Sequence, residues 1–142
     1  WLGTLDKYSG DGLVAFWGAP LTCPDQADRA VSAALDILVE VDAFNHDRQS
    51  RGFSPVRVRI GIESGNALVG DLGTAFRSTY TAVGDCINFA SRLEAAARDL
   101  PTQLVIGVAA QRKLIKHKTS SLGQITLRGT ETTIEVFTVD LY

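Results

Sequence analysis

The feature that most limits the possible folds is a change of hydrophobic period near residue 25. Before it, two apolar runs, 2–8 and 13–17, flank a Ser-Gly-Asp-Gly turn, which is typical of a β-hairpin. After it, apolar residues follow one helical stripe for about five turns, ending before Gly52 and Pro55. The stripe consists of Ala27, Ala30, Val31, Ala34, Leu38 and Val41. Hairpin strands beside a long amphipathic helix favour an α+β fold.

The rest of the chain continues this mixture. Residues 56–63 alternate between apolar and polar side chains and predict the clearest strand of the sequence. The other predicted elements are a return strand (67–69), an extended segment (78–83), a helix from 85 to about 98, a strand (104–106), a short helix (108–115) and a closing hairpin (121–127 and 133–139). The order ββαββαβαββ predicts helices that cover one face of a mainly antiparallel sheet.

Composition limits the functional class. The 142 residues are 45% hydrophobic and carry a net charge of −2, which fits a single globular domain over 1–142. This acidic balance disfavours a nucleic-acid surface. Cys23 and Cys86 match no metal-binding spacing; they are compatible with one disulfide and favour two reduced thiols. No signal peptide is visible in these residues, and no apolar run among them is long enough to span a bilayer. The chain starts at Trp1 and contains no Met, so we expect it to be part of a longer protein.

The segment 83–94 carries the most specific local chemistry. Gly84 permits a sharp turn, and Asp85 is a good N-cap for the helix that follows. Asn88 and Arg92 stand four residues apart and therefore share one helix face. An amide beside a guanidinium suits an anionic transition state. The alternative, a solvated polar face, is the more economical interpretation of this helix taken alone.

Other candidate residues lie in turns. Asp11, between glycines at a hairpin tip, could ligate a divalent cation, although Asp-Gly is also ordinary turn chemistry. Arg128, beside Gly129, and Arg77 are basic residues in predicted loops, where such charges are usually solvated. His46 and His117 lie in polar stretches, and we expect them to be surface residues without a role.

Taken together, three segments resemble the catalytic domain of class III nucleotidyl cyclases. Residues 7–20 resemble the central hairpin of that family, and residues 59–65 resemble its R-I-G-I-x-x-G strand. Residues 80–94 resemble its Y-x-x-x-G-D-x-V-N-x-A-x-R-L-E signature. Their order and spacing also fit, and the resemblance covers essentially the whole chain. It implies the ferredoxin-like, palm-type α+β fold of class III cyclases, with a mainly antiparallel sheet and helices packed on it.

The resemblance also implies roles for individual residues. Asp11 matches the second of two aspartates that bind two Mg²⁺ or Mn²⁺ ions. Asn88 and Arg92 match the pair that orients the ribose and stabilises the transition state at the α-phosphate. Arg128 matches a basic residue that binds the terminal phosphates. The implied reaction is attack of the 3′-hydroxyl of ATP on the α-phosphate, which yields cyclic AMP and pyrophosphate.

Lys7 and Thr81 match the two positions that select the base. Adenine presents an acceptor at N1 and a donor at N6, which suit a lysine and a threonine hydroxyl respectively. Guanine presents an acceptor at O6 and donors at N1 and N2, and would favour an acidic residue in place of Lys7. The pair therefore favours ATP over GTP.

The resemblance further implies a homodimer with sites at the subunit interface, an upstream regulatory domain in the parent chain, and a cytoplasmic location with or without a membrane anchor. One departure is plain. The family's first metal aspartate, first strand and first two helices have no counterpart in these 142 residues. We therefore expect the fragment alone to be inactive and to expose a sheet edge.

Three other functions compete with an adenylate cyclase. The first is a non-catalytic cyclase-homology module for regulation or dimerisation, and the second is a guanylate cyclase. The third is a nucleic-acid-binding α+β module, which the net charge and the lack of an exposed aromatic-basic strand oppose. The non-catalytic module is disfavoured because residues matching the family's site are present, namely Lys7, Asp11, Asn88 and Arg92.

Overall fold

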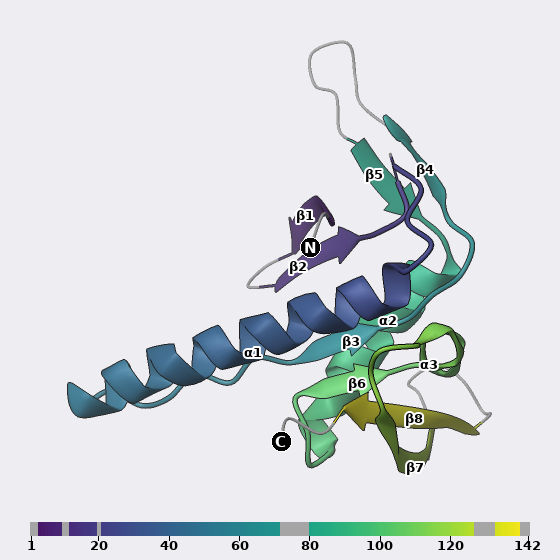
Figure 1. The fold of residues 1–142 in the computed structure, drawn as a ribbon. Helices are drawn as coiled ribbons and strands as arrows, with labels where there is room; N and C mark the ends of the chain where they lie inside the picture. Colours follow the sequence, from purple (N-terminus) through teal and green to yellow (C-terminus); the bar gives the residue numbers. More distant parts are fainter. Residues whose placement is uncertain (1–2, 10–11, 20, 72–79, 127–132, 140–142) are drawn as a thin grey trace.

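A computed structural model describes residues 3–9, 12–19, 21–71, 80–126 and 133–139 (Figure 1). Among these residues the strands form one four-stranded sheet and two separate two-stranded ribbons. In chain order the elements are β1 (Thr4–Ser9), β2 (Gly12–Phe16), α1 (Gln26–Ser50), β3 (Ile60–Ile62), β4 (Leu68–Asp71), β5 (Tyr80–Val83), α2 (Asp85–Ala96), a 3-10 turn (Ala97–Asp99), β6 (Leu104–Ile106), α3 (Val108–Lys113), β7 (Thr119–Thr126) and β8 (Thr133–Val139).

The four-stranded sheet has the order β3-β6-β8-β7. Strands β3 and β6 are parallel, whereas β6–β8 and β7–β8 are antiparallel. The ribbons β1–β2 and β4–β5 are antiparallel too. The expectations of a mainly antiparallel α+β fold, an N-terminal hairpin and a closing hairpin are therefore confirmed.

The helices cover both faces of the four-stranded sheet, which corrects the expectation of a single covered face. All three residues of β6 are buried. Leu104 and Ile106 pack with Val31 of α1, whereas Val105, between them, packs with Leu93 of α2. Successive strand residues point to opposite faces, so α1 and α2 lie on opposite sides (Figure 1).

Helix α1 is 25 residues long, about two turns more than the apolar stripe predicts. Its buried residues belong to the first half and end at Leu38. The second half projects beyond the sheet and exposes apolar residues such as Val39 and Phe44 (Figure 1). Among the described residues, no helix combines the length and apolar character needed to cross a bilayer.

Asp28 is the one buried charged residue of the described core, with 3% of its surface exposed. Its carboxylate accepts hydrogen bonds from the backbone N–H groups of Ile115 (3.1 and 3.2 Å) and Lys116 (2.9 Å). One turn along α1, the Ser32 hydroxyl lies 2.9 Å from Nε2 of His117. His117 is thus half-buried and bonded rather than a free surface residue, and these contacts fasten the α3–β7 connection to α1.

The strand predicted over 56–63 forms only over Ile60–Ile62. The reason is that Val56 satisfies its backbone elsewhere: both its N–H and its carbonyl bond to the Asn45 side chain at 2.7 Å. The Arg57 guanidinium donates to backbone carbonyls of residues 97, 100 and 102. The predicted return strand is also wrong in its partner, because β4 pairs with β5 and not with β3. The order therefore becomes ββαβββαβαββ.

Strand β3 and helix α2 approach so closely that only glycine fits at position 61. A Cβ atom at Gly61 would collide with the Ala90 carbonyl and lie 2.5 Å from the Glu94 backbone nitrogen. At the strand's start, the Arg59 guanidinium pairs with the Glu94 carboxylate at 3.5 Å. Two segments that were singled out in the sequence thus pack directly on each other, and β3 fixes the position of α2.

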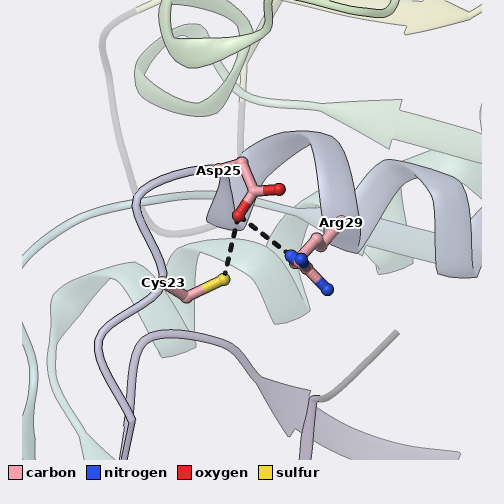
Figure 2. Close-up of polar contacts among 3 residues, drawn as sticks. All are labelled: Cys23, Asp25 and Arg29. Carbon is pink, nitrogen blue, oxygen red and sulfur yellow. Dashed lines mark hydrogen bonds and ion pairs between the residues drawn. The ribbon is translucent and has the colours of Figure 1, made fainter.

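The start of α1 carries a small polar cluster (Figure 2). The Asp25 carboxylate accepts from Nε of Arg29 at 2.9 Å and from the Cys23 thiol at 3.4 Å. The bond from Arg29 lowers the pKa of Asp25, and burial together with Asp25 raises the pKa of Cys23. Cys23 and Cys86 are both free thiols, as favoured from the sequence. Asp25 and Arg29 neutralise each other within this cluster at the start of α1. We therefore assign the cluster no catalytic or binding role.

Candidate functional site

Helix α2 begins in a way that the sequence did not predict. Asp85 is its first residue rather than its N-cap, and no side chain caps the helix. The N-cap is Gly84, where a Cβ atom would approach the Asn66 carbonyl to 2.9 Å and the Ala67 Cα to 3.1 Å. Gly84 is therefore required by the close passage of the 66–67 backbone. Gly84 is the single residue between the end of β5 and the start of α2.

Asn88 and Arg92 lie on the outward side of α2, as the four-residue spacing predicts. Both are exposed, whereas Leu93 and Ala97 are fully buried beneath the helix. Neither side chain bonds to another described residue. Arg57 and Arg59, by contrast, are engaged by backbone carbonyls and by Glu94. The packing of the domain thus uses these two arginines and leaves Arg92 available on the surface.

The structure brings Lys7 and Thr81, which are 74 positions apart in the sequence, onto neighbouring strands. Lys7 belongs to β1 and Thr81 to β5. The residues beside them are joined directly: Oδ2 of Asp6 accepts a hydrogen bond from the Ala82 backbone N–H at 3.3 Å. Asp6 was not recognised from the sequence, where an acidic residue in a strand carries no distinctive signal.

Asp11, Arg128 and Arg77 lie outside the described residues. Within the described part of the chain, no three His, Cys, Asp or Glu side chains gather as metal ligands would. The predicted metal ligand Asp11 therefore remains a prediction.

Two other groups near α2 are structural. Oε1 of Glu63 accepts from the backbone N–H groups of Ser64 and Ala110, each at 2.9 Å, and so ties the end of β3 to α3. Burial raises the pKa of the Cys86 thiol, which keeps it protonated at neutral pH and disfavours a nucleophilic role.

The family model for the adenylate and guanylate cyclase catalytic domain matches residues 7–140. This chain belongs to the class III nucleotidyl cyclase family. The match contains residues 7–20, 59–65 and 80–94, which carry the resemblance, and the resemblance is confirmed.

Two curated relatives are themselves adenylate cyclases. The chain is 34% identical over 140 residues to adenylate cyclase 1 of Rhizobium meliloti (strain 1021), covering 96% of this chain and 21% of that protein. It is 28% identical over 145 residues to an adenylate cyclase of Anabaena cylindrica, covering 96% of this chain and 28% of that protein. The chain thus spans between 21% and 28% of the length of these relatives.

Solved structures confirm the class III cyclase fold. The adenylyl cyclase CyaB from P. aeruginosa superposes with a TM-score of 0.83 at 28% identity, over 97% of this chain and 71% of that one. The guanylyl cyclase Cya2 superposes equally well, with a TM-score of 0.83 at 25% identity, over 96% of this chain and 69% of that one. The fold alone therefore does not distinguish ATP from GTP cyclases.

Proposed function

We propose that this cyclase domain converts ATP to 3′,5′-cyclic AMP and pyrophosphate. The observation that carries the proposal is the placement of Lys7 and Thr81 on neighbouring strands joined by the Asp6–Ala82 hydrogen bond. A lysine donor complements the N1 acceptor of adenine, and a threonine hydroxyl acceptor complements its N6 donor. Guanine has a donor at N1 and an acceptor at O6, so both hydrogen-bonding roles are reversed. The 34% identity to an adenylate cyclase supports the same substrate.

Arg92 and Asn88 are proposed to act at the reacting end of the nucleotide. Charge develops on the α-phosphate oxygens as the 3′-hydroxyl attacks, and a fixed guanidinium stabilises that charge without reorganising. Asn88, one turn earlier on the same exposed side, is suited to hold the ribose so that its hydroxyl faces the phosphorus. Helix α2 provides a rigid base for both, because β3 packs against its backbone at Gly61.

The proposed active form is a homodimer with each site shared between two subunits. The β1–β2 and β4–β5 ribbons expose apolar side chains that a monomer would normally bury, including Leu13 (56% exposed) and Val83 (54% exposed). Exposed apolar residues of this kind mark interaction surfaces. They lie on the same elements as Lys7 and Thr81, so a second copy covering them would close over the base.

The proposal includes a divalent ion, Mg²⁺ or Mn²⁺, with Asp11 as a ligand and Arg128 near the terminal phosphates. Such an ion, when bound, offsets phosphate charge during an in-line displacement. The cytoplasm, which supplies ATP, is the proposed location. A guanylate cyclase is the second candidate, because Cya2 matches the fold as well as CyaB does.

Complementation between two inactive variants tests the shared site. Full-length Asp11→Ala and Arg92→Ala are each expected to lose activity, because each removes one part of every site. When the two are co-expressed with different tags, half of the dimers are mixed and hold one intact site of two. Cyclic AMP formation should then recover to roughly a quarter of the wild-type rate.

Co-expression of two differently tagged Arg92→Ala chains is the control and should recover nothing. A mixture that stays as inactive as its parents, although mixed dimers are isolated by tandem affinity purification, would show that each site lies within one subunit.

A further inference from the structure

We propose that Asp6 is a positioning residue that sets the spacing between the two base-reading strands and thereby the choice of nucleotide. The inference rests on the proposed function, because it concerns the pair Lys7 and Thr81. Asp6 precedes Lys7 on β1, and its hydrogen-bond partner Ala82 follows Thr81 on β5.

The first observation is a β-bulge at Asp6. Leu5 pairs with Ala15 and Lys7 pairs with Val14, so Asp6 has no partner residue on β2. A bulge inserts one residue into a strand and changes the direction of the side chains around it, and bulges are frequent next to active sites. Here the extra residue is the one whose carboxylate reaches the neighbouring ribbon.

The second observation is that the carboxylate replaces a strand ladder. Within the described residues, β1 and β5 belong to separate two-stranded sheets and share no ladder pairing. The Ala82 amide would therefore lack a strand partner on this side, and Ala82 is 2% exposed, which keeps water from it. Oδ2 of Asp6, at 3.3 Å, satisfies the amide and joins the ribbons.

The link between Asp6 and Ala82 has a cost in folding stability. Oδ1 of Asp6 is buried and has no hydrogen-bond partner among the described residues. A buried carboxylate oxygen without a donor disfavours the folded state, so stability alone would favour an apolar residue here. An unsatisfied buried polar atom calls for an explanation, and the control of the distance between the Lys7 and Thr81 backbones provides one.

Removal of the Asp6 carboxylate is expected to weaken the discrimination between ATP and GTP and to leave the cyclisation step intact. Without the carboxylate, the described hydrogen bond between β1 and β5 is lost, and the two base-reading residues are no longer held as a pair. Asn88 and Arg92 stand on α2, which is held by β3, so the reacting end of the nucleotide is unaffected. Selectivity should fall while turnover on the better substrate changes little.

The experiment measures kcat and KM for both ATP and GTP with full-length Asp6→Ala, Asp6→Asn and Thr4→Val. Asp6→Ala should reduce the ratio of kcat/KM values for the two nucleotides roughly tenfold, the effect of one well-placed hydrogen bond. Asp6→Asn retains an acceptor oxygen for the Ala82 amide and should keep the ratio within about threefold of the wild type. If Asp6→Ala does not fold, Asp6→Ser, whose shorter side chain cannot span the gap, takes its place.

Thr4→Val is the matched control on the same strand. It removes the bond from the Thr4 hydroxyl to the Ala19 carbonyl (2.8 Å) but leaves the link to β5 intact. Its nucleotide ratio should equal that of the wild type. Equal losses on ATP and GTP in Asp6→Ala, or an unchanged ratio, would overturn the inference.

The wild-type ratio tests the proposed function separately. A preference for GTP would contradict the adenylate assignment and still test Asp6, because loss of a positioned pair moves either preference toward parity. A wild-type protein that forms no cyclic nucleotide would contradict both.

Discussion

Arg92→Ala is expected to lower kcat for cyclic nucleotide formation about 100-fold or more, with the fold unchanged. The effect corresponds to about 3 kcal/mol of transition-state stabilisation, as for the removal of a single oxyanion donor. The fold should persist because the Arg92 side chain is exposed and makes no bond to another described residue. Steady-state kinetics of the full-length protein, together with its thermal melting temperature, provide the measurement.

The control is Arg98→Ala, which removes an exposed arginine six positions further along, in the 3-10 turn after α2. It has the same charge change and a similar setting, and its kcat should stay within about twofold of the wild type, as for an ordinary surface substitution. If both variants lose activity equally, Arg92 contributes only to the general charge of the surface, and its assignment to the transition state is wrong.

Gly61→Ala is expected to destabilise the domain by about 3 kcal/mol. The added methyl group would meet the α2 backbone at Ala90 and Glu94, neither of which can rotate away as a side chain could. Overfilled contacts of this kind cost about 1–3 kcal/mol, and a clash with backbone lies at the upper end. Urea denaturation of the purified protein measures the change in the free energy of unfolding.

Gly70→Ala is the matched control, because a Cβ atom at Gly70 meets nothing within 4 Å. Its free energy of unfolding should remain within about 0.5 kcal/mol of the wild type. A Gly61→Ala protein as stable as Gly70→Ala would mean that α2 does not lie against β3 as described, and the rigid support claimed for Asn88 and Arg92 would fail with it.

Much of the fold follows from the sequence because its strongest signals are local. The helical stripe in α1, the closing hairpin and the apolar strand β6 reflect side-chain periods that survive in the structure. The alternation over 56–63 fails for a non-local reason: the Asn45 side chain captures the backbone of Val56. The apolar–polar alternation of a segment does not show that a side chain of another element will bond to its backbone in place of a neighbouring strand.

In the candidate site, too, the features within one helix were predictable from the sequence, and those that depend on distant segments were not. The shared face of Asn88 and Arg92 is a property of one helix and was predictable. Asp85 is a residue type that favours the N-cap position, but it is the first residue of α2 and the N-cap is Gly84. The need for glycine at position 84 comes from the nearby backbone of residues 66–67, which the sequence does not reveal. The proximity of Lys7 to Thr81 and the part played by Asp6 depend on contacts between distant strands, which only the structure provides.

Product analysis of the full-length protein tests whether this domain is an adenylate cyclase. The purified protein is given ATP or GTP with Mg²⁺ or Mn²⁺, and cyclic nucleotides are separated and quantified by chromatography and mass spectrometry. We expect cyclic AMP and an equimolar amount of pyrophosphate, with a higher kcat/KM for ATP than for GTP. Cyclic GMP as the preferred product, or no cyclic nucleotide from a folded dimer with either ion, would contradict this assignment.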